Sequence, residues 1–160
     1  MTDEPAGDDG VFARESRYLE TYVQIVVEDG HITEVTFPER PDESAGEKHP
    51  MLDRIEKYLT GTVKDNFDDV PVAPDVPDDI AEVLEAVRTI PYGTALSCAE
   101  LLRENKGLDP TLASDHDLVR VALDANPTPL VIPDHRIRDA PSGAPPAIEQ
   151  RLRSLERIVT

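Results

Sequence analysis

The sequence has little of several residue types, and each shortage excludes a class of protein. Its 160 residues include one cysteine, Cys98, and no tryptophan. A single cysteine excludes an internal disulfide framework and indicates a reducing compartment such as the cytoplasm. No apolar run approaches the ~18 residues of a membrane span, and the acidic residues 1–10 lack the basic-then-apolar order of a signal peptide. The histidines show no metal-ligand spacing, so we expect a cytoplasmic monomer without metal, cofactor or membrane contact.

Basic residues are also scarce. The chain has 16 lysines and arginines against 33 acidic residues, a formal net charge of -17 at pH 7 and a pI near 4.4. Lysine is the rarer base, present only at Lys48, Lys57, Lys64 and Lys106. A surface rich in acids and poor in lysine keeps a protein hydrated in concentrated salt, which favours a halophilic host. An acidic protein from an ordinary cytosol is the alternative.

The first half of the chain has the pattern of a small α/β domain. Residues 22–27 and 31–37 are β-rich and flank an Asp-Gly turn, which predicts an antiparallel hairpin. Apolar residues at helical spacing predict a helix over residues 51–59. We expect the acidic residues 1–15 to be loose or disordered.

A domain boundary is predicted near the middle of the chain. Residues 70–77 include three prolines, so this segment is at most an edge strand followed by a linker. We place the boundary near Val76, with an N-terminal domain over residues 1–76 and a C-terminal domain over residues 77–160. The expected fold class is α+β.

The second half has the periodicity of helices. Two of the predicted helices are short and joined by a loop, an arrangement that resembles a helix-turn-helix whose second helix reads DNA. The expected start signals of the helices are Asp78 or Asp79, a capping box of Ser97 with Glu100, residues 114–117, and Pro145 or Pro146.

The most informative segment is Asn126-Pro127-Thr128-Pro129-Leu130-Val131-Ile132-Pro133-Asp134-His135-Arg136-Ile137. It resembles the N-P-x-P-h-x-h-P-C-H-R-h signature of the alkylguanine-DNA alkyltransferases, the methylated-DNA–protein-cysteine methyltransferases. In that family the cysteine takes the alkyl group from damaged guanine, and Asp134 holds its place here. The resemblance covers about residues 18–158. Its weaker parts are residues 51–61, similar to an L-x-x-Y-L-x-G helix, residues 89–97, similar to an I-P-Y-G-x-h-x-S-Y turn, and Pro141-Ser142-Gly143, similar to a Y-S-G-G loop.

This resemblance implies a fold and a set of roles. The implied fold is a small ribonuclease H-like α/β domain followed by a winged helix-turn-helix-like domain. His135 and Glu156 match the family's proton relay beside the acceptor. Asn126 matches the residue that braces the turn, and Arg136 matches the structural arginine.

The DNA-binding positions are less well matched. Counting back from Asn126, the family's base-flipping arginine falls at Asp117, and its small glycines fall at Arg120 and Val121. The predicted recognition helix is therefore acidic, whereas phosphate contacts dominate affinity for nucleic acid. The candidate DNA-binding residues carried over from the family are Arg136, Ser142, Gly143, Cys98, Asp117 and Arg120.

Two candidate acceptors remain. Asp134 is a weaker nucleophile than a thiolate, and a methyl ester on it would be open to hydrolysis. The simpler hypothesis is that Asp134 pairs with His135 or Arg136 as a satisfied buried charge. Cys98 lies next to a predicted helix N-terminus, which favours a thiolate. A lone cysteine in such a place is more often a small buried hydrophobe.

Three functions stay open from the sequence. In the first, the protein binds double-stranded DNA with alkylated guanine without repairing it and recruits another repair protein. In the second, it is an active methyltransferase through Asp134 or Cys98. In the third, it is an interaction module that keeps the fold and no longer binds DNA. The retained His135, Asn126 and Glu156 favour the first two functions. Asp117 and the acidic recognition helix favour the third. We take the first function as the prediction.

Overall fold

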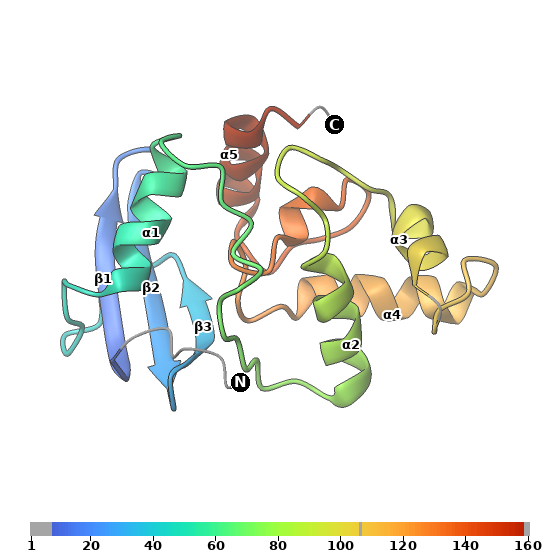
Figure 1. The fold of residues 1–160 in the computed structure, drawn as a ribbon, viewed down its shortest axis with the longest axis horizontal. Helices are drawn as coiled ribbons and strands as arrows, with labels where there is room; N and C mark the ends of the chain where they lie inside the picture. The colour runs from blue at the N-terminus through green and yellow to red at the C-terminus, as the bar shows by residue number, and fades with distance from the viewer. Residues whose placement is uncertain (1–7, 106, 159–160) are drawn as a thin grey trace.

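The computed structural model describes residues 8–105 and 107–158, and it shows an α+β chain (Figure 1). Strands β1 (Gly10–Ser16), β2 (Thr21–Glu28) and β3 (His31–Thr36) form an antiparallel sheet in the order β1-β2-β3. Asp29 and Gly30 join β2 to β3 with φ values of 51° and 75°. Two successive positive φ values fit a type I′ turn, so the predicted hairpin is present.

Strand β1 corrects one expectation. The sequence predicted a loose segment over residues 1–15, but residues 10–15 belong to this strand, while residues 1–7 lie outside the described part of the chain. The strand pairs along its whole length with β2, and Ala13 also donates its backbone N–H to the carbonyl of Gly46 at 2.9 Å. The local acidic composition indicated neither the pairing with β2 nor the bond to Gly46.

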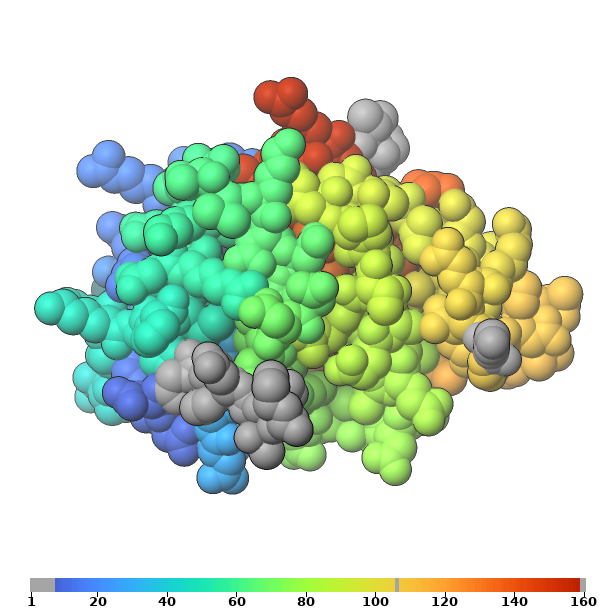
Figure 2. Space-filling model, in the orientation of Figure 1, coloured from blue at the N-terminus to red at the C-terminus, as the bar shows by residue number. Residues whose placement is uncertain are grey.

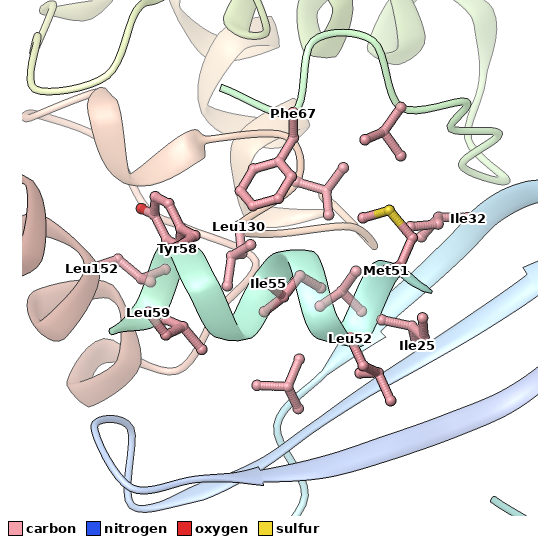
Figure 3. Packing of buried hydrophobic residues seen from close by; sticks show 14 of the residues in the cluster. Ile25, Ile32, Met51, Leu52, Ile55, Tyr58, Leu59, Phe67, Leu130 and Leu152 are labelled. Atoms are coloured by element: carbon pink, nitrogen blue, oxygen red, sulfur yellow. The ribbon is translucent and has the colours of Figure 1, made fainter. Parts of the chain in front are cut away.

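Helix α1 (Pro50–Leu59) packs against the sheet. Its start is capped by His49, whose Nδ1 accepts the backbone N–H of Met51 at 3.0 Å. Figure 3 shows Leu52 on the side of α1 that faces the strands, with Tyr58 and Phe67 on the other side. The helix therefore buries one face in the sheet and directs Tyr58 toward the rest of the molecule.

The second half contains α2 (Asp78–Val87), α3 (Cys98–Glu104), α4 (Ala113–Asp124), the short 3-10 helix η1 (Asp134–Arg136) and α5 (Pro146–Glu156). The capping box of Ser97 and Glu100 is present at α3. Two start signals were wrong, because α2 follows Pro77 and α4 follows Leu112 without a side-chain cap. None of the helices in residues 8–105 and 107–158 is long and apolar enough to cross a membrane.

Two buried clusters hold the chain together. One lies between α2, α3 and α4, to the right in Figure 1. The other lies between the sheet and α1, and it also includes Leu130, Val131 and, from α5, Ile148 and Leu152. The segment after α4 thus supplies Leu130 and Val131 to the first half's core and Ile132 and Ile137 to the second's. The boundary near Val76 stays a prediction.

Candidate functional site

The segment that follows α4 is buried where the two clusters meet. Every residue from Leu130 to Ile137 is buried. Figure 2 shows the green and yellow residues of the 60–100 region across the middle of the molecule. Leu130 has a positive φ of 76°, which turns the chain after Pro129. The backbone N–H of Leu96 then bonds to the carbonyl of Arg136 at 2.8 Å, so η1 is fixed against the 89–97 turn. The backbone therefore holds Asp134 and its neighbours rigidly inside the protein.

Asp134 is fully buried and accepts hydrogen bonds on both oxygens. Its Oδ2 accepts from Asn126 Nδ2 at 3.0 Å and from the backbone N–H of Gly143 at 2.7 Å. Its Oδ1 accepts from the Ser142 hydroxyl at 2.6 Å. Burial raises the pKa of Asp134, and these hydrogen bonds together with nearby His135 oppose the rise. Asp134 was expected to pair with His135 or Arg136. That expectation was wrong, because both of those side chains contact Glu156 instead.

Glu156 gathers donors from several parts of the chain. Arg136 donates from Nε to Oε1 at 2.8 Å and from Nη2 to Oε2 at 3.0 Å, and His135 Nε2 lies 2.6 Å from Oε2. Tyr58 also donates to Oε2, and the backbone N–H of Gly93 donates to Oε1 at 2.9 Å. Burial alone would raise the pKa of Glu156, but the hydrogen bonds and charges of His135 and Arg136 lower it to about 2. The group is therefore a carboxylate at neutral pH.

The carboxylate fixes the orientation of His135. A carboxylate only accepts hydrogen bonds, so Nε2 of His135 carries the proton that points at Glu156. In the neutral imidazole the lone pair is then on Nδ1, which is buried and has no hydrogen-bond partner among the described protein groups. The site thus combines a buried carboxylate, Asp134, with an adjacent oriented imidazole that has one free nitrogen.

Several residues of this network were missed from the sequence. Tyr58 comes from α1, and its pKa is raised well above the usual value by burial and by Glu156, so it remains a donor. Gly93 lies in the 89–97 turn, and the carbonyl of Ile90 accepts from Arg136 Nη1 at 2.7 Å. Tyr58 and Gly93 stand in segments that carried the family resemblance, but no local pattern connects them to Glu156.

Comparisons with known proteins bear on the family and the fold of this chain. No family model matches the chain. The methylated-DNA–protein-cysteine methyltransferase of Methanopyrus kandleri is 35% identical over 108 residues, which cover 65% of this chain and 76% of that protein. The chain belongs to the methylated-DNA–protein-cysteine methyltransferase family.

Solved structures of methyltransferases share the fold. The Mycobacterium tuberculosis O6-methylguanine methyltransferase has a TM-score of 0.67 at 18% identity, covering 93% of this chain and 92% of that one. The enzyme from Pyrococcus kodakaraensis strain KOD1 has a TM-score of 0.66 at 16% identity, covering 92% and 99%. A complex of the Mycobacterium tuberculosis protein with DNA has a TM-score of 0.65 at 19% identity, covering 92% and 91%. The α+β fold expected from the family resemblance is therefore confirmed.

In this family member, Cys98 is poorly suited to accept an alkyl group. Its side chain is buried at the start of α3, and its backbone N–H donates to Asp139 Oδ1 at 2.8 Å. Burial, followed by the hydrogen bond and charge of Asp139, raises the pKa of the thiol to about 11. The expectation that the helix N-terminus favours a thiolate was wrong, because a carboxylate occupies that N-terminus and the thiol is desolvated.

The candidate DNA-binding residues carried over from the family fall in different places. Cys98 and Arg136 are buried, so the expected DNA contact is wrong for them, whereas the candidates on α4 lie at the surface. Asp117, Arg120 and Asp124 are exposed on one side of α4, and the side chain of Val121 between them is 56% exposed. Ser142 and Gly143 are different, because they lie at the surface and still bond to Asp134. The structure thus brings Asn126, Asp134, Ser142 and Gly143 together and leaves Asp117 and Arg120 on the outer face of α4.

Proposed function

We propose that this family member recognises alkylated guanine in double-stranded DNA and keeps no alkyl group on a protein thiol. One observation carries the proposal: Asp134, at the acceptor position, is locked by Asn126, Ser142 and Gly143 within an otherwise retained site. Cys98 is no substitute, since its pKa is about 11. The relative from Methanopyrus kandleri is named for methylated DNA, and one structure of the fold was solved in complex with DNA.

The surface charge determines how the affinity for DNA depends on salt concentration. The exposed side of α4 carries Asp117 and Asp124 against Arg120, and the whole chain has a formal charge of -17. Repulsion of phosphates is largest at low salt, and the Debye length falls to about 3 Å at 1 M salt. We therefore expect affinity for DNA to be flat or to rise with potassium chloride, opposite to the usual counterion-release behaviour. Preference for a damaged base must then come from the site around Asp134.

A binding assay tests the proposal. Fluorescent duplexes that differ by one O6-methylguanine are titrated with the protein over a series of potassium chloride concentrations. The expected result is tighter binding of the alkylated duplex, with no radiolabelled methyl retained on the protein. Equal binding of both duplexes, or none, would refute the recognition of alkylated guanine. A lasting label on Cys98 would identify an active thiol methyltransferase.

An interaction module is the second candidate function, and the outer face of α4 favours it. Leu112 and Val121 are exposed by 48% and 56%, respectively, beside Asp117 and Asp124. An acidic surface with exposed apolar side chains fits a basic protein partner better than a phosphate backbone. This candidate predicts that neither duplex binds, and that substitutions at Val121 alter association with other repair proteins while substitutions at Asp134 do not.

A further inference from the structure

We propose that Asp134, His135 and Glu156 form a hydrolytic dealkylation site, in which Asp134 takes the alkyl group as an ester and water then removes it. This activity rests on the proposed recognition of alkylated guanine, because the base must reach Asp134 before any chemistry occurs. It would convert a stoichiometric alkyl acceptor into a catalyst that turns over. The substrate class is an O-alkylated guanine, and the co-reactant is water.

The two oxygens of Asp134 are held differently. Oδ2 accepts from two N–H groups, the side-chain amide of Asn126 at 3.0 Å and the backbone of Gly143 at 2.7 Å. Oδ1 accepts from the Ser142 hydroxyl, whose rotation can release it. Oδ1 is therefore the oxygen available for attack at carbon. Once Oδ1 carries the alkyl group, Oδ2 is the ester carbonyl oxygen, and its two N–H donors form an oxyanion hole for hydrolysis.

The imidazole of His135 is arranged as a general base. Its Nε2 is held by Glu156 at 2.6 Å, and its buried Nδ1 has no partner among the described protein groups. A base oriented by a carboxylate on one nitrogen and free on the other is the arrangement that activates nucleophiles in acyl-transfer sites. Tyr58 and Arg136 donate to the same carboxylate of Glu156, so they position the base without touching the reacting atoms.

The reaction proceeds in two steps. In the first step Oδ1 attacks the alkyl carbon, the bond from that carbon to O6 of guanine breaks, and the electron pair leaves with the base, which takes a proton from solvent. In the second step water attacks the ester carbonyl carbon of Asp134 and gives its proton to His135 Nδ1. The tetrahedral intermediate collapses to the carboxylic acid of Asp134, and the departing alkoxide takes that proton from His135. The carboxylic acid then returns one proton to solvent, which balances the proton that guanine took. For a methyl group the sum is O6-methylguanine and water giving guanine and methanol, with the carboxylate and imidazole regenerated.

Access to the site requires movement of one loop. Asp134 is fully buried, whereas Ser142 is half-buried and Gly143 is exposed, and both bond to the carboxylate, so the 141–143 loop connects it to the surface. An added Cβ on Gly143 would lie 2.1 Å from the backbone oxygen of Asn126, which shows how closely this loop is seated. Entry of the alkylated base must therefore lift the Ser142 hydroxyl from Oδ1, which is the same change that exposes the attacking oxygen.

The decisive experiment measures methanol. The whole protein in potassium chloride is incubated with radiolabelled O6-methylguanine, as a duplex and as the free base, and both volatile methanol and protein-bound label are counted. We expect the wild-type protein to release more than one methanol per chain. Asp134→Asn should release none while keeping the fold, because its amide can accept from Asn126 and Gly143 and donate to Ser142. Asp68→Asn, an identical charge change at an exposed residue, should match the wild type.

Two further measurements identify the ester. In His135→Gln the ester should persist, so that each chain retains one methyl group on Asp134 and becomes one CH2 unit heavier. In heavy-oxygen water the wild-type protein should release a first methanol with ordinary oxygen and acquire the heavy isotope in Asp134. Direct attack of water on the methyl carbon would place the heavy isotope in methanol from the start and overturn the mechanism.

The outcomes separate this activity from the proposed function. If the protein prefers the alkylated duplex and releases no methanol from either substrate, the hydrolytic activity is refuted and recognition stands. If it releases methanol from the free base and binds neither duplex, recognition of DNA is refuted and the hydrolytic site stands. If it neither binds nor reacts, both are refuted.

Discussion

Substitution of Glu156 by glutamine is the sharpest test of the buried network. The carboxylate balances the buried guanidinium of Arg136 through two hydrogen bonds and also accepts from His135, Tyr58 and Gly93. Removing one partner of a buried ion pair costs about 3–5 kcal/mol, because the other charge is left uncompensated. The pKa of Glu156, lowered from 4.5 to about 2 by the same contacts, corresponds to about 3 kcal/mol. We expect Glu156→Gln to lower the free energy of unfolding by about 3 kcal/mol at neutral pH.

This loss should depend on pH in a defined direction. The folded-state pKa of Glu156 is depressed, so its contribution is fully present above the unfolded value of 4.5 and is lost as the pH falls through about 2. The difference in stability between wild type and Glu156→Gln should therefore be largest near pH 7 and should shrink as the pH is lowered toward about 3.

Urea unfolding followed by circular dichroism measures this difference at each pH. Urea leaves the ionic strength unchanged, so the potassium chloride concentration can be held constant. Glu85→Gln is the matched control, because Glu85 is 67% exposed and lies 3.5 Å from Arg88, and such surface pairs contribute below about 1 kcal/mol. A loss in Glu156→Gln that equals the control, or that is the same at both ends of the pH range, would refute the reasoning.

Four more predictions follow from single contacts. Tyr58→Phe removes the donor to a buried carboxylate and should cost about 2 kcal/mol in urea unfolding; an unchanged midpoint would contradict the contact. Gly143→Ala should destabilise the protein, since its Cβ would lie 2.1 Å from a backbone oxygen, whereas Gly107→Ala, with open space around its Cβ, should be nearly neutral. Asp117→Arg should tighten duplex binding and make it weaken with salt; unchanged titrations would mean that α4 does not face DNA. Cys98, with a pKa of about 11, should resist thiol alkylation at neutral pH until the protein is unfolded.

The sequence by itself determined the features that depend on near neighbours. The Asp-Gly turn predicted the β2–β3 hairpin because both residues tolerate a positive φ. The capping box at α3 was predictable because Ser97 and Glu100 satisfy backbone N–H groups within one turn. The order of the motif residues, with Asp134 before His135, identified the family and the altered acceptor position without any coordinates.

The tertiary structure decided everything that depends on residues far apart in the chain. Strand β1 was missed because its acidic composition does not indicate its pairing with β2 or its backbone bond to the distant Gly46. Tyr58 and Glu156 are 98 positions apart, and only packing of α1 beside α5 brings the hydroxyl to the carboxylate. The partners of Asp134 and the raised pKa of Cys98 likewise follow from burial, because desolvation penalises a charge according to its surroundings and not its sequence neighbours.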